Sequence, residues 1–166
     1  MFRPQSKTEP NRTRLTVGGN LIEFNGDKST RIAAITTAKI VLNDVVSTDN
    51  AKAACMDVKN FYLGTPMNDP SEYEYMKIPL HLIPDEIIKQ YNLLQLVHNG
   101  NVHVEIRRGV YGLPQAGIMA NKQLAKFPAK EGYFQTPHTP GLWTHAWRPI
   151  SFALIVDDFL INYVGK

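Results

Sequence analysis

The stretch ISFALIVDDFLINYV, residues 150–164, decides the fold expected of this chain. Two apolar runs, Ile150 to Val156 and Phe159 to Val164, flank the acidic pair Asp157-Asp158. Short apolar runs rich in β-branched and aromatic residues are typical of buried strands, and aspartate is favoured in tight turns. The stretch therefore predicts a strand, a tight turn at the acidic pair, and a second antiparallel strand.

The acidic pair has two explanations. Aspartate caps the local backbone of a tight turn, which requires no ligand. Alternatively, two carboxylates held on rigid strands and joined by a third can bind two metal ions about 3.5–4 Å apart. Asp57 could be the third, since it lies near the end of the apolar run Ala53 to Val58, although a lone aspartate there is more often a cap or turn residue. Such oxygen ligands favour Mg²⁺ or Mn²⁺ over zinc.

In the rest of the chain, segments with the hydrophobic pattern of a strand alternate with segments that have the pattern of a helix, and glycine and proline mark the breaks between them. We expect one α+β domain over residues 12–166, with helices packed on an antiparallel sheet, after a loose N-terminal arm at residues 1–11. In the first half of the chain we expect a hairpin over 12–24 broken at Gly18-Gly19, a helix capped by Thr36 or Thr37 that stops near Ser47 to Asn50, and a buried strand at Ala53–Val58. A strand at Tyr73–Ile78 and a short helix opened by Pro84 should follow. The last expected elements before the acidic pair are a hairpin between Leu93–His98 and Asn101–Ile106, and a helix from Ala116 to Phe127 ended or kinked by Pro128.

Composition narrows the class of protein. Hydrophobic residues make up 43% and charged residues 20% of the 166 residues, as in ordinary soluble domains. No stretch approaches the roughly 20 apolar residues of a membrane-spanning helix, and the polar start is unlike a signal peptide. We therefore expect a cytoplasmic or nuclear protein without a membrane partner. Cys55 is the only cysteine, which excludes an internal disulfide and a cysteine-based zinc site.

The charge permits a polyanionic partner without requiring one. The formal net charge is +3 and the sequence pI is about 9.0. Lys122, Lys126 and Lys130 follow one another at helical spacing, and the first third of the chain includes Arg12, Arg14, Lys28 and Arg31. On charge alone, a solvated surface is the favoured explanation of these residues.

Two histidines and three aromatic residues near the C-terminus could belong to a metal or nucleic-acid site, but ordinary structural positions are favoured for all of them. His138 and His145 lack metal-binding spacing, so we expect loop or surface positions. Tyr133, Trp143 and Trp147 could stack on bases, although core packing is the commoner role of such rings.

Three segments together resemble a known family. MDVKNFYLGTPM (residues 56–67), GVYGLPQAGIMANKQL (109–124) and LIVDDFLINYVG (154–165) resemble, in the same order, the three catalytic motifs of copia-type retrotransposon reverse transcriptases. The resemblance implies a fingers-and-palm fold and RNA-directed DNA polymerase activity. It also implies two Mg²⁺ or Mn²⁺ ions, an RNA or DNA template with a primer, and deoxynucleoside triphosphates as substrates.

The resemblance also implies roles for particular residues. Asp57, Asp157 and Asp158 match the catalytic carboxylates and would be metal ligands, together with the backbone carbonyl of Val58. Tyr62 matches the aromatic steric gate, which closes the space that a ribose 2′-hydroxyl needs.

Two further matches concern the incoming nucleotide. Gln115 matches a glutamine that contacts it, and Arg14 or Arg12 matches a basic fingers residue that pairs with the triphosphate. Taken singly, Tyr62 is better explained as a core aromatic, and Gln115 belongs to a plain loop before a helix. Either arginine is equally well explained as an unpaired surface residue.

The chain departs from the family in three ways. Ile155 stands where the family usually has tyrosine near the primer end, Pro128 interrupts the helix after the second motif, and the sequence given stops shortly after Asp158. We therefore expect a fragment truncated before the thumb. The alternative is a catalytically inactive remnant of a retroelement with residual nucleic-acid binding. An unrelated metal-dependent hydrolase is less favoured, because no obvious general base accompanies the acids.

Overall fold

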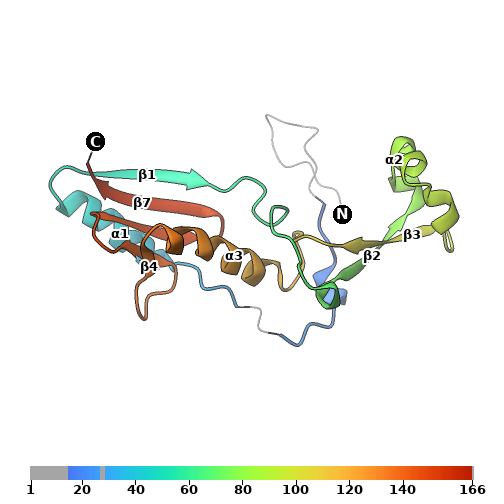
Figure 1. Cartoon of the computed structure of the whole chain (residues 1–166), viewed down its shortest axis with the longest axis horizontal. Coiled ribbons are helices and arrows are strands. Elements are labelled where there is room, and N and C mark those ends of the chain that lie inside the picture. The colour runs from blue at the N-terminus through green and yellow to red at the C-terminus, as the bar shows by residue number, and fades with distance from the viewer. Residues whose placement is uncertain (1–14, 27–28, 166) are drawn as a thin grey trace.

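The chain folds into two lobes joined by a narrow middle (Figure 1). The computed structural model describes residues 15–26 and 29–165, so the predicted arm at residues 1–11 lies outside the described residues. The helices and strands are α1 (Ile35–Ser47), β1 (Ala51–Asp57), β2 (Glu74–Pro79), α2 (Asp85–Gln90), β3 (Asn101–Ile106), α3 (Ala116–Lys130), β4 (Tyr133–Gln135), β5 (Leu142–His145), β6 (Ile150–Ile155) and β7 (Asp158–Val164). Short 3₁₀ helices occupy Gly19–Leu21, Pro70–Glu72, Leu80–Leu82 and Leu93–Leu96.

The larger lobe is a five-stranded antiparallel sheet in the order β1-β7-β6-β5-β4. The smaller lobe is the antiparallel pair β2-β3 with α2 beside it (Figure 1). Mixed helices and antiparallel sheets make this an α+β protein, as the sequence predicts.

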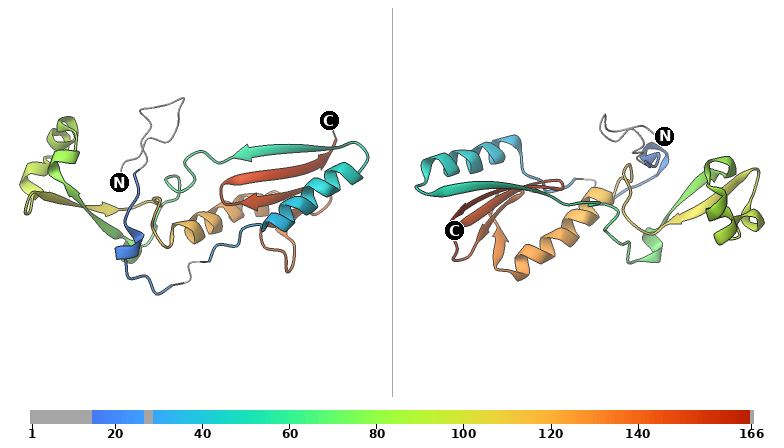
Figure 2. Two further views of the ribbon diagram at one scale, coloured as in Figure 1. Left: turned by 180° about the vertical axis from the view of Figure 1, so that it is seen from behind. Right: turned by 90° about the horizontal axis from the view of Figure 1, so that it is seen from above.

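The two long helices pack on opposite faces of the large sheet. On one face, Val41 of α1 is buried with Ala33 and with Ala153 of β6. On the other face, Leu124 of α3 packs against a buried cluster made of Trp143, Phe152 and Leu154. Phe152 and Leu154 flank Ala153 in β6, so their side chains point to the opposite face from that of Ala153. The right-hand view of Figure 2 shows the strands between α1 and α3. β6 is buried on both faces, which explains its nearly continuous apolar sequence.

A separate core joins the lobes. Met67, Ile106, Leu113 and Ala116 are buried together where β3 ends and α3 begins. These residues come from the segments that flank β2 and β3, so the smaller lobe is attached to α3 through apolar packing.

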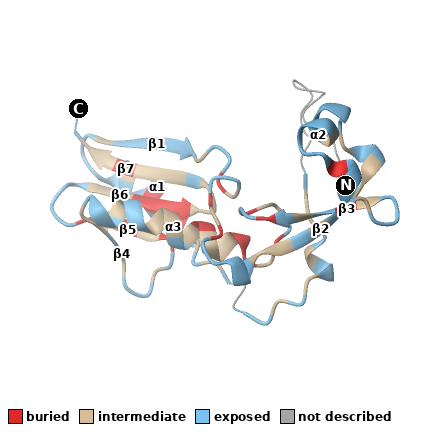
Figure 3. Cartoon of the chain, turned by 45° about the vertical axis from the view of Figure 1, so that its right-hand side comes forward, coloured by how far each residue is buried: buried red, intermediate tan, exposed pale blue. Residues whose placement is uncertain are grey.

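β1 departs from the expected buried strand. The predicted strand exists, but β1 is the edge of the sheet and most of its residues are exposed, as its pale blue ribbon in Figure 3 shows. Its inner edge pairs with β7, whereas its outer edge has no neighbouring strand among the described residues. The apolar run in the sequence therefore reflects strand formation with one neighbour and not burial on both sides.

Two predicted hairpins do not form as expected. Residues 15–24 contain no strand, because the backbone N–H of Val17 donates to the Tyr111 carbonyl (2.9 Å) instead of to a neighbouring hairpin strand. Asn99 and Gly100 both have positive φ, as a tight hairpin turn needs. However, His98 and Asn101 form only an isolated bridge, and residues 93–96 before it form a 3₁₀ helix instead of a strand. β3 pairs instead with β2, which occupies its hydrogen-bonding edge.

The helix predictions are largely confirmed. α1 ends at Ser47 as expected, although its N-cap is Ala34 and neither threonine caps it. α2 begins directly after Pro84. α3 continues through Pro128 to Lys130, since proline in the last turn removes only one hydrogen bond near the helix end.

The residues around β5 correct two further expectations. His145 is buried rather than on the surface, and its Nδ1 accepts hydrogen bonds from the backbone N–H groups of Trp147 (3.2 Å) and Arg148 (3.1 Å). Trp143 is buried as expected, but Trp147 is 74% exposed, and its ring meets that of His145 in a T-shaped contact. His145 therefore fixes the turn that leads into β6.

We expect His145→Phe to lower the free energy of unfolding by about 1–3 kcal/mol, because two backbone N–H groups lose their acceptor while the ring is kept. Urea denaturation followed by circular dichroism measures the change. The matched control is His103→Phe at an exposed position of β3, where we expect a change within about 0.5 kcal/mol. Equal losses in the two variants would contradict the role given to His145.

Candidate functional site

The β6–β7 hairpin places the acidic pair differently from the sequence prediction. Ile155 pairs with Asp158, so the turn consists of Val156 and Asp157, and Asp158 is the first residue of β7. Val156 has φ +61°, a conformation that β-branched residues rarely adopt. Of the two turn residues it is the one with positive φ, as in a type II′ turn. A strained backbone of this kind persists only where its surroundings enforce it.

Asp57 lies directly beside this hairpin. In the register between β1 and β7, Asp57 is opposite Asp158, and the Val58 N–H donates to the Asp157 carbonyl (2.9 Å). Directly opposed residues project from the same face of a sheet, with Cβ atoms about 4.5–5.5 Å apart. The ends of β1 and β7 lie side by side in Figure 1. The structure thus places Asp57 opposite Asp158, with Asp157 in the adjoining turn.

The donor atoms at this point suit a hard divalent cation. Asp57 and Asp158 are exposed and Asp157 is half-buried, and none of the three makes an ion pair with a described residue. The Val58 carbonyl accepts no backbone hydrogen bond from the described part of the chain. Oxygen donors of this kind fit Mg²⁺ or Mn²⁺. However, residues 15–26 and 29–165 contain no three acidic, histidine or cysteine side chains gathered into a metal-binding group, so the two-ion site stays a prediction.

Tyr62 lies close to these acids. It belongs to a tight segment in which the Gly64 N–H donates to the Asn60 carbonyl (2.7 Å) and the Thr65 N–H to the Tyr62 carbonyl (2.9 Å). Partial burial, the nearby Asp157 carboxylate and the Tyr111 side chain together raise the pKa of the Tyr62 phenol. Tyr62 is therefore neither a plain core residue nor a free surface residue.

Gln115 is buried in a different environment from the one expected. Its Nε2 donates to Glu74 Oε1 (3.3 Å), while its Oε1 has no hydrogen-bond partner. Glu23 and Glu72 line the same hollow, whose volume is about 430 Å³. Carboxylates disfavour a triphosphate nearby, so the structure gives Gln115 a structural partner, and its contact with a nucleotide stays a prediction.

Arg12 and Arg14 both lie outside the described residues, so the fingers arginine remains a sequence prediction. Leu113 is buried in the core between the lobes and leads into the N-terminus of α3.

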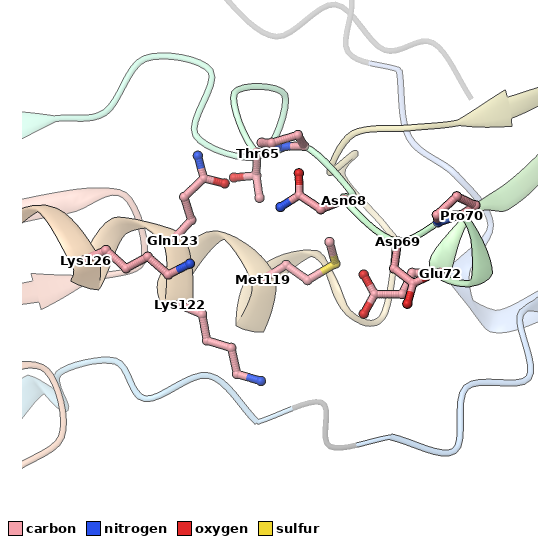
Figure 4. Close-up of a pocket in the computed structure, with 10 residues that line it drawn as sticks. Thr65, Asn68, Asp69, Pro70, Glu72, Met119, Lys122, Gln123 and Lys126 are labelled. Atoms are coloured by element: carbon pink, nitrogen blue, oxygen red, sulfur yellow. The ribbon is translucent and has the colours of Figure 1, made fainter.

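Two of the three helical lysines line a hollow of about 510 Å³ between α3 and the segment 65–72 (Figure 4). Lys122 and Lys126 share it with Asp69 and Glu72, whose carboxylates lie near Met119. A hydrogen bond from Ser71 lowers the pKa of Asp69 and so keeps its charge negative. Because both signs of charge are present, this hollow is not a dedicated anion site.

Tyr111 is a residue to which the sequence assigned no role. Its ring meets Tyr62 edge-on, with the centroids 4.8 Å apart and the planes at 85°. The available signal was its position inside the second motif, between Val110 and Gly112. The contact with Tyr62 became visible only in the folded chain.

Comparison with known proteins adds no family assignment. The chain matches no protein-family model, and no curated protein or solved structure shows a significant similarity to it. Among the described residues, no helix has the length and apolar character needed to cross a bilayer.

We expect Asp157→Asn to lower the pKa of the Tyr62 phenol while leaving it above the ordinary value of about 10. A negative carboxylate disfavours the tyrosinate anion, but partial burial, the larger cause, remains. The measurement is a pH titration of ¹³Cζ-labelled tyrosine by NMR, with Tyr62→Phe to assign the signal. Asp85→Asn in α2 is the matched control and should leave the titration unchanged. An unchanged pKa in Asp157→Asn would contradict the proximity of the two groups.

Proposed function

We propose that this chain is the fingers-and-palm part of an RNA-directed DNA polymerase of the copia-type retrotransposon kind. The observation that supports the proposal most is the pairing of β1 with β7, which sets Asp57 opposite Asp158. The first motif that resembles this family contributes Asp57 and Tyr62, the third contributes the pair Asp157-Asp158, and these residues are neighbours in the fold. A different arrangement, with Asp57 on a distant strand, would have removed the proposal.

The proposed reaction joins a deoxynucleotide to a primer. The 3′-hydroxyl of the primer loses its proton and attacks the α-phosphorus of a deoxynucleoside triphosphate, forming a phosphodiester bond and releasing pyrophosphate. Asp57, Asp157, Asp158 and the Val58 carbonyl would hold the divalent cations. Such cations supply charge neutralisation of the triphosphate and a lower pKa for the attacking hydroxyl. The protein's own contribution is to place the carboxylates and to position the sugar.

Tyr62 would act on the sugar. A half-buried ring next to the carboxylates leaves little room for a 2′-hydroxyl, so a deoxyribose is preferred over a ribose. The Tyr62 phenol is neutral at physiological pH, as any tyrosine with an ordinary or raised pKa is, so it adds no negative charge beside the triphosphate.

One observation favours the alternative of an inactive remnant that still binds nucleic acid. Ile155, which replaces the family's usual tyrosine, packs against the buried cluster of Ala33, Val41 and Ala153. Its side chain therefore contributes to the core beneath α1 and offers no polar group to a primer. Primer extension separates the two functions.

We expect the folded protein to extend a DNA primer on an RNA template in the presence of Mg²⁺ or Mn²⁺. Asp157→Asn should reduce the extension rate by about a hundredfold or more, because cation binding and charge stabilisation are weakened. Asp85→Asn, remote from the carboxylates in α2, should retain the wild-type rate. Well-folded wild-type protein that extends no primer with either cation would favour the inactive remnant.

A thermal-shift assay tests cation binding separately from catalysis. At Mn²⁺ concentrations about 100 times its Kd, binding stabilises a folded protein by about 2.7 kcal/mol. For a chain of this size, that corresponds to a rise in Tm of about 5–10 °C. Asp57→Asn should abolish most of this rise, whereas Asp85→Asn should preserve it. Equal rises in wild type and Asp57→Asn would place the bound Mn²⁺ elsewhere.

A further inference from the structure

The backbone of Tyr111 is held by a segment from the start of the chain. The Tyr111 carbonyl accepts the hydrogen bond from Val17, and Gly112 follows with φ +96°. A Cβ atom on Gly112 would lie only 2.2 Å from the Val17 carbonyl oxygen. Only glycine allows the two segments to approach this closely, in a conformation that other residues disfavour. Tyr111 is therefore anchored at its main chain.

The backbone of Tyr62 is anchored independently. Its carbonyl accepts the Thr65 N–H, and the Thr65 hydroxyl donates to the Phe61 carbonyl (3.0 Å). The Gly109 backbone passes so close that a Cβ there would lie 2.7 Å from the Tyr62 carbonyl oxygen. The strand-like segment that leads to Tyr111 thus runs directly beside Tyr62.

The two rings then limit each other. Tyr62 contacts Tyr111 edge-to-face, and the ring of Phe61 lies on it at a 5.3 Å centroid distance and a tilt of 49°. Edge-to-face aromatic pairs are attractive, because the positive edge of one ring meets the negative face of the other. With both backbones fixed, this contact restricts the side-chain rotation of Tyr62.

We infer that Tyr111 is a positioning residue: its edge-to-face contact fixes the orientation of the Tyr62 ring and so sets how strictly the site rejects a ribose. The sugar-selecting part of this inference rests on the proposed polymerase function. The ring-positioning part stands on the contacts of Tyr62, Tyr111 and Val17 alone. The influence of both Asp157 and Tyr111 on the Tyr62 phenol agrees with this arrangement.

The first test measures the ring itself and needs no catalysis. We expect Tyr111→Ala to lower the pKa of Tyr62 towards about 10, since burial and the Tyr111 phenol are both lost. Nuclear Overhauser contacts between the Tyr62 ring and its neighbours should also weaken. Tyr111→Phe should keep those contacts, because the edge-to-face ring is retained. Tyr91→Ala, at an exposed position after α2, is the matched control and should change neither quantity.

The second test measures sugar selection by primer extension with ribonucleotides and deoxynucleotides. We expect Tyr111→Ala to lower the preference for deoxynucleotides by about threefold to tenfold, the range that such an aromatic pair is worth. Tyr62→Ala should lower the preference for deoxynucleotides at least as far, whereas Tyr111→Phe should keep the wild-type preference. A change in KM for the ribonucleotide with little change in kcat for the deoxynucleotide would mark positioning rather than general damage.

The outcomes separate the two claims. If folded Tyr111→Ala leaves the pKa and ring contacts of Tyr62 unchanged, Tyr111 does not position Tyr62, whatever the activity. If the ring moves as expected but sugar preference is unchanged, the specificity role is overturned. If the wild type extends no primer, the proposed function and the sugar role fall together, and the ring measurement alone decides the positioning role.

Discussion

The ladder between β1 and β7 is the contact on which the rest of the site depends. It joins two segments that lie far apart in the sequence and sets Asp57 opposite Asp158. Its strength comes from main-chain hydrogen bonds, since β1 is an exposed edge strand with little apolar burial. A register slip by one residue would turn Asp57 to the other face of the sheet. The position of the acids is therefore a property of strand pairing and not of side-chain packing.

The burial of β6 explains how an exposed edge can hold a precise register. Ala153 and Leu154 are among the most buried residues, and they pack against opposite faces of the sheet. β6 fixes β7 through the hairpin at Val156 and Asp157, and β7 in turn fixes β1. The cost of a strained Val156, about 1–3 kcal/mol, is borne by a hairpin whose strands are well packed. The packed core around β6 therefore fixes the positions of the acids through the pairing of β6 with β7 and of β7 with β1.

The second half of the site depends on close backbone contacts between the lobes. Gly112 and the neighbouring Gly19 allow the N-terminal segment to lie against the second motif, and Gly109 does the same beside Tyr62. These contacts, with the core of Met67, Ile106 and their neighbours, link the smaller lobe to the residues that follow β1. Tyr62 therefore lies where the two lobes meet, next to the end of the large sheet.

The sequence by itself determined the kinds of element and their chemistry: the apolar runs that form β1, β6 and β7, the helices α1 and α3, and the acids that follow the strands. These are local properties, set by periodicity and turn propensity over a few residues. Only the tertiary structure decided which strand pairs with which, that β1 is an edge, that Asp158 belongs to β7 and not to the turn, and that Tyr111 meets Tyr62. The same holds for the absent 15–24 hairpin, because Tyr111, far along the chain, accepts the hydrogen bond of the Val17 N–H. Long-range pairing is chosen by the global packing of the core, which no local pattern records.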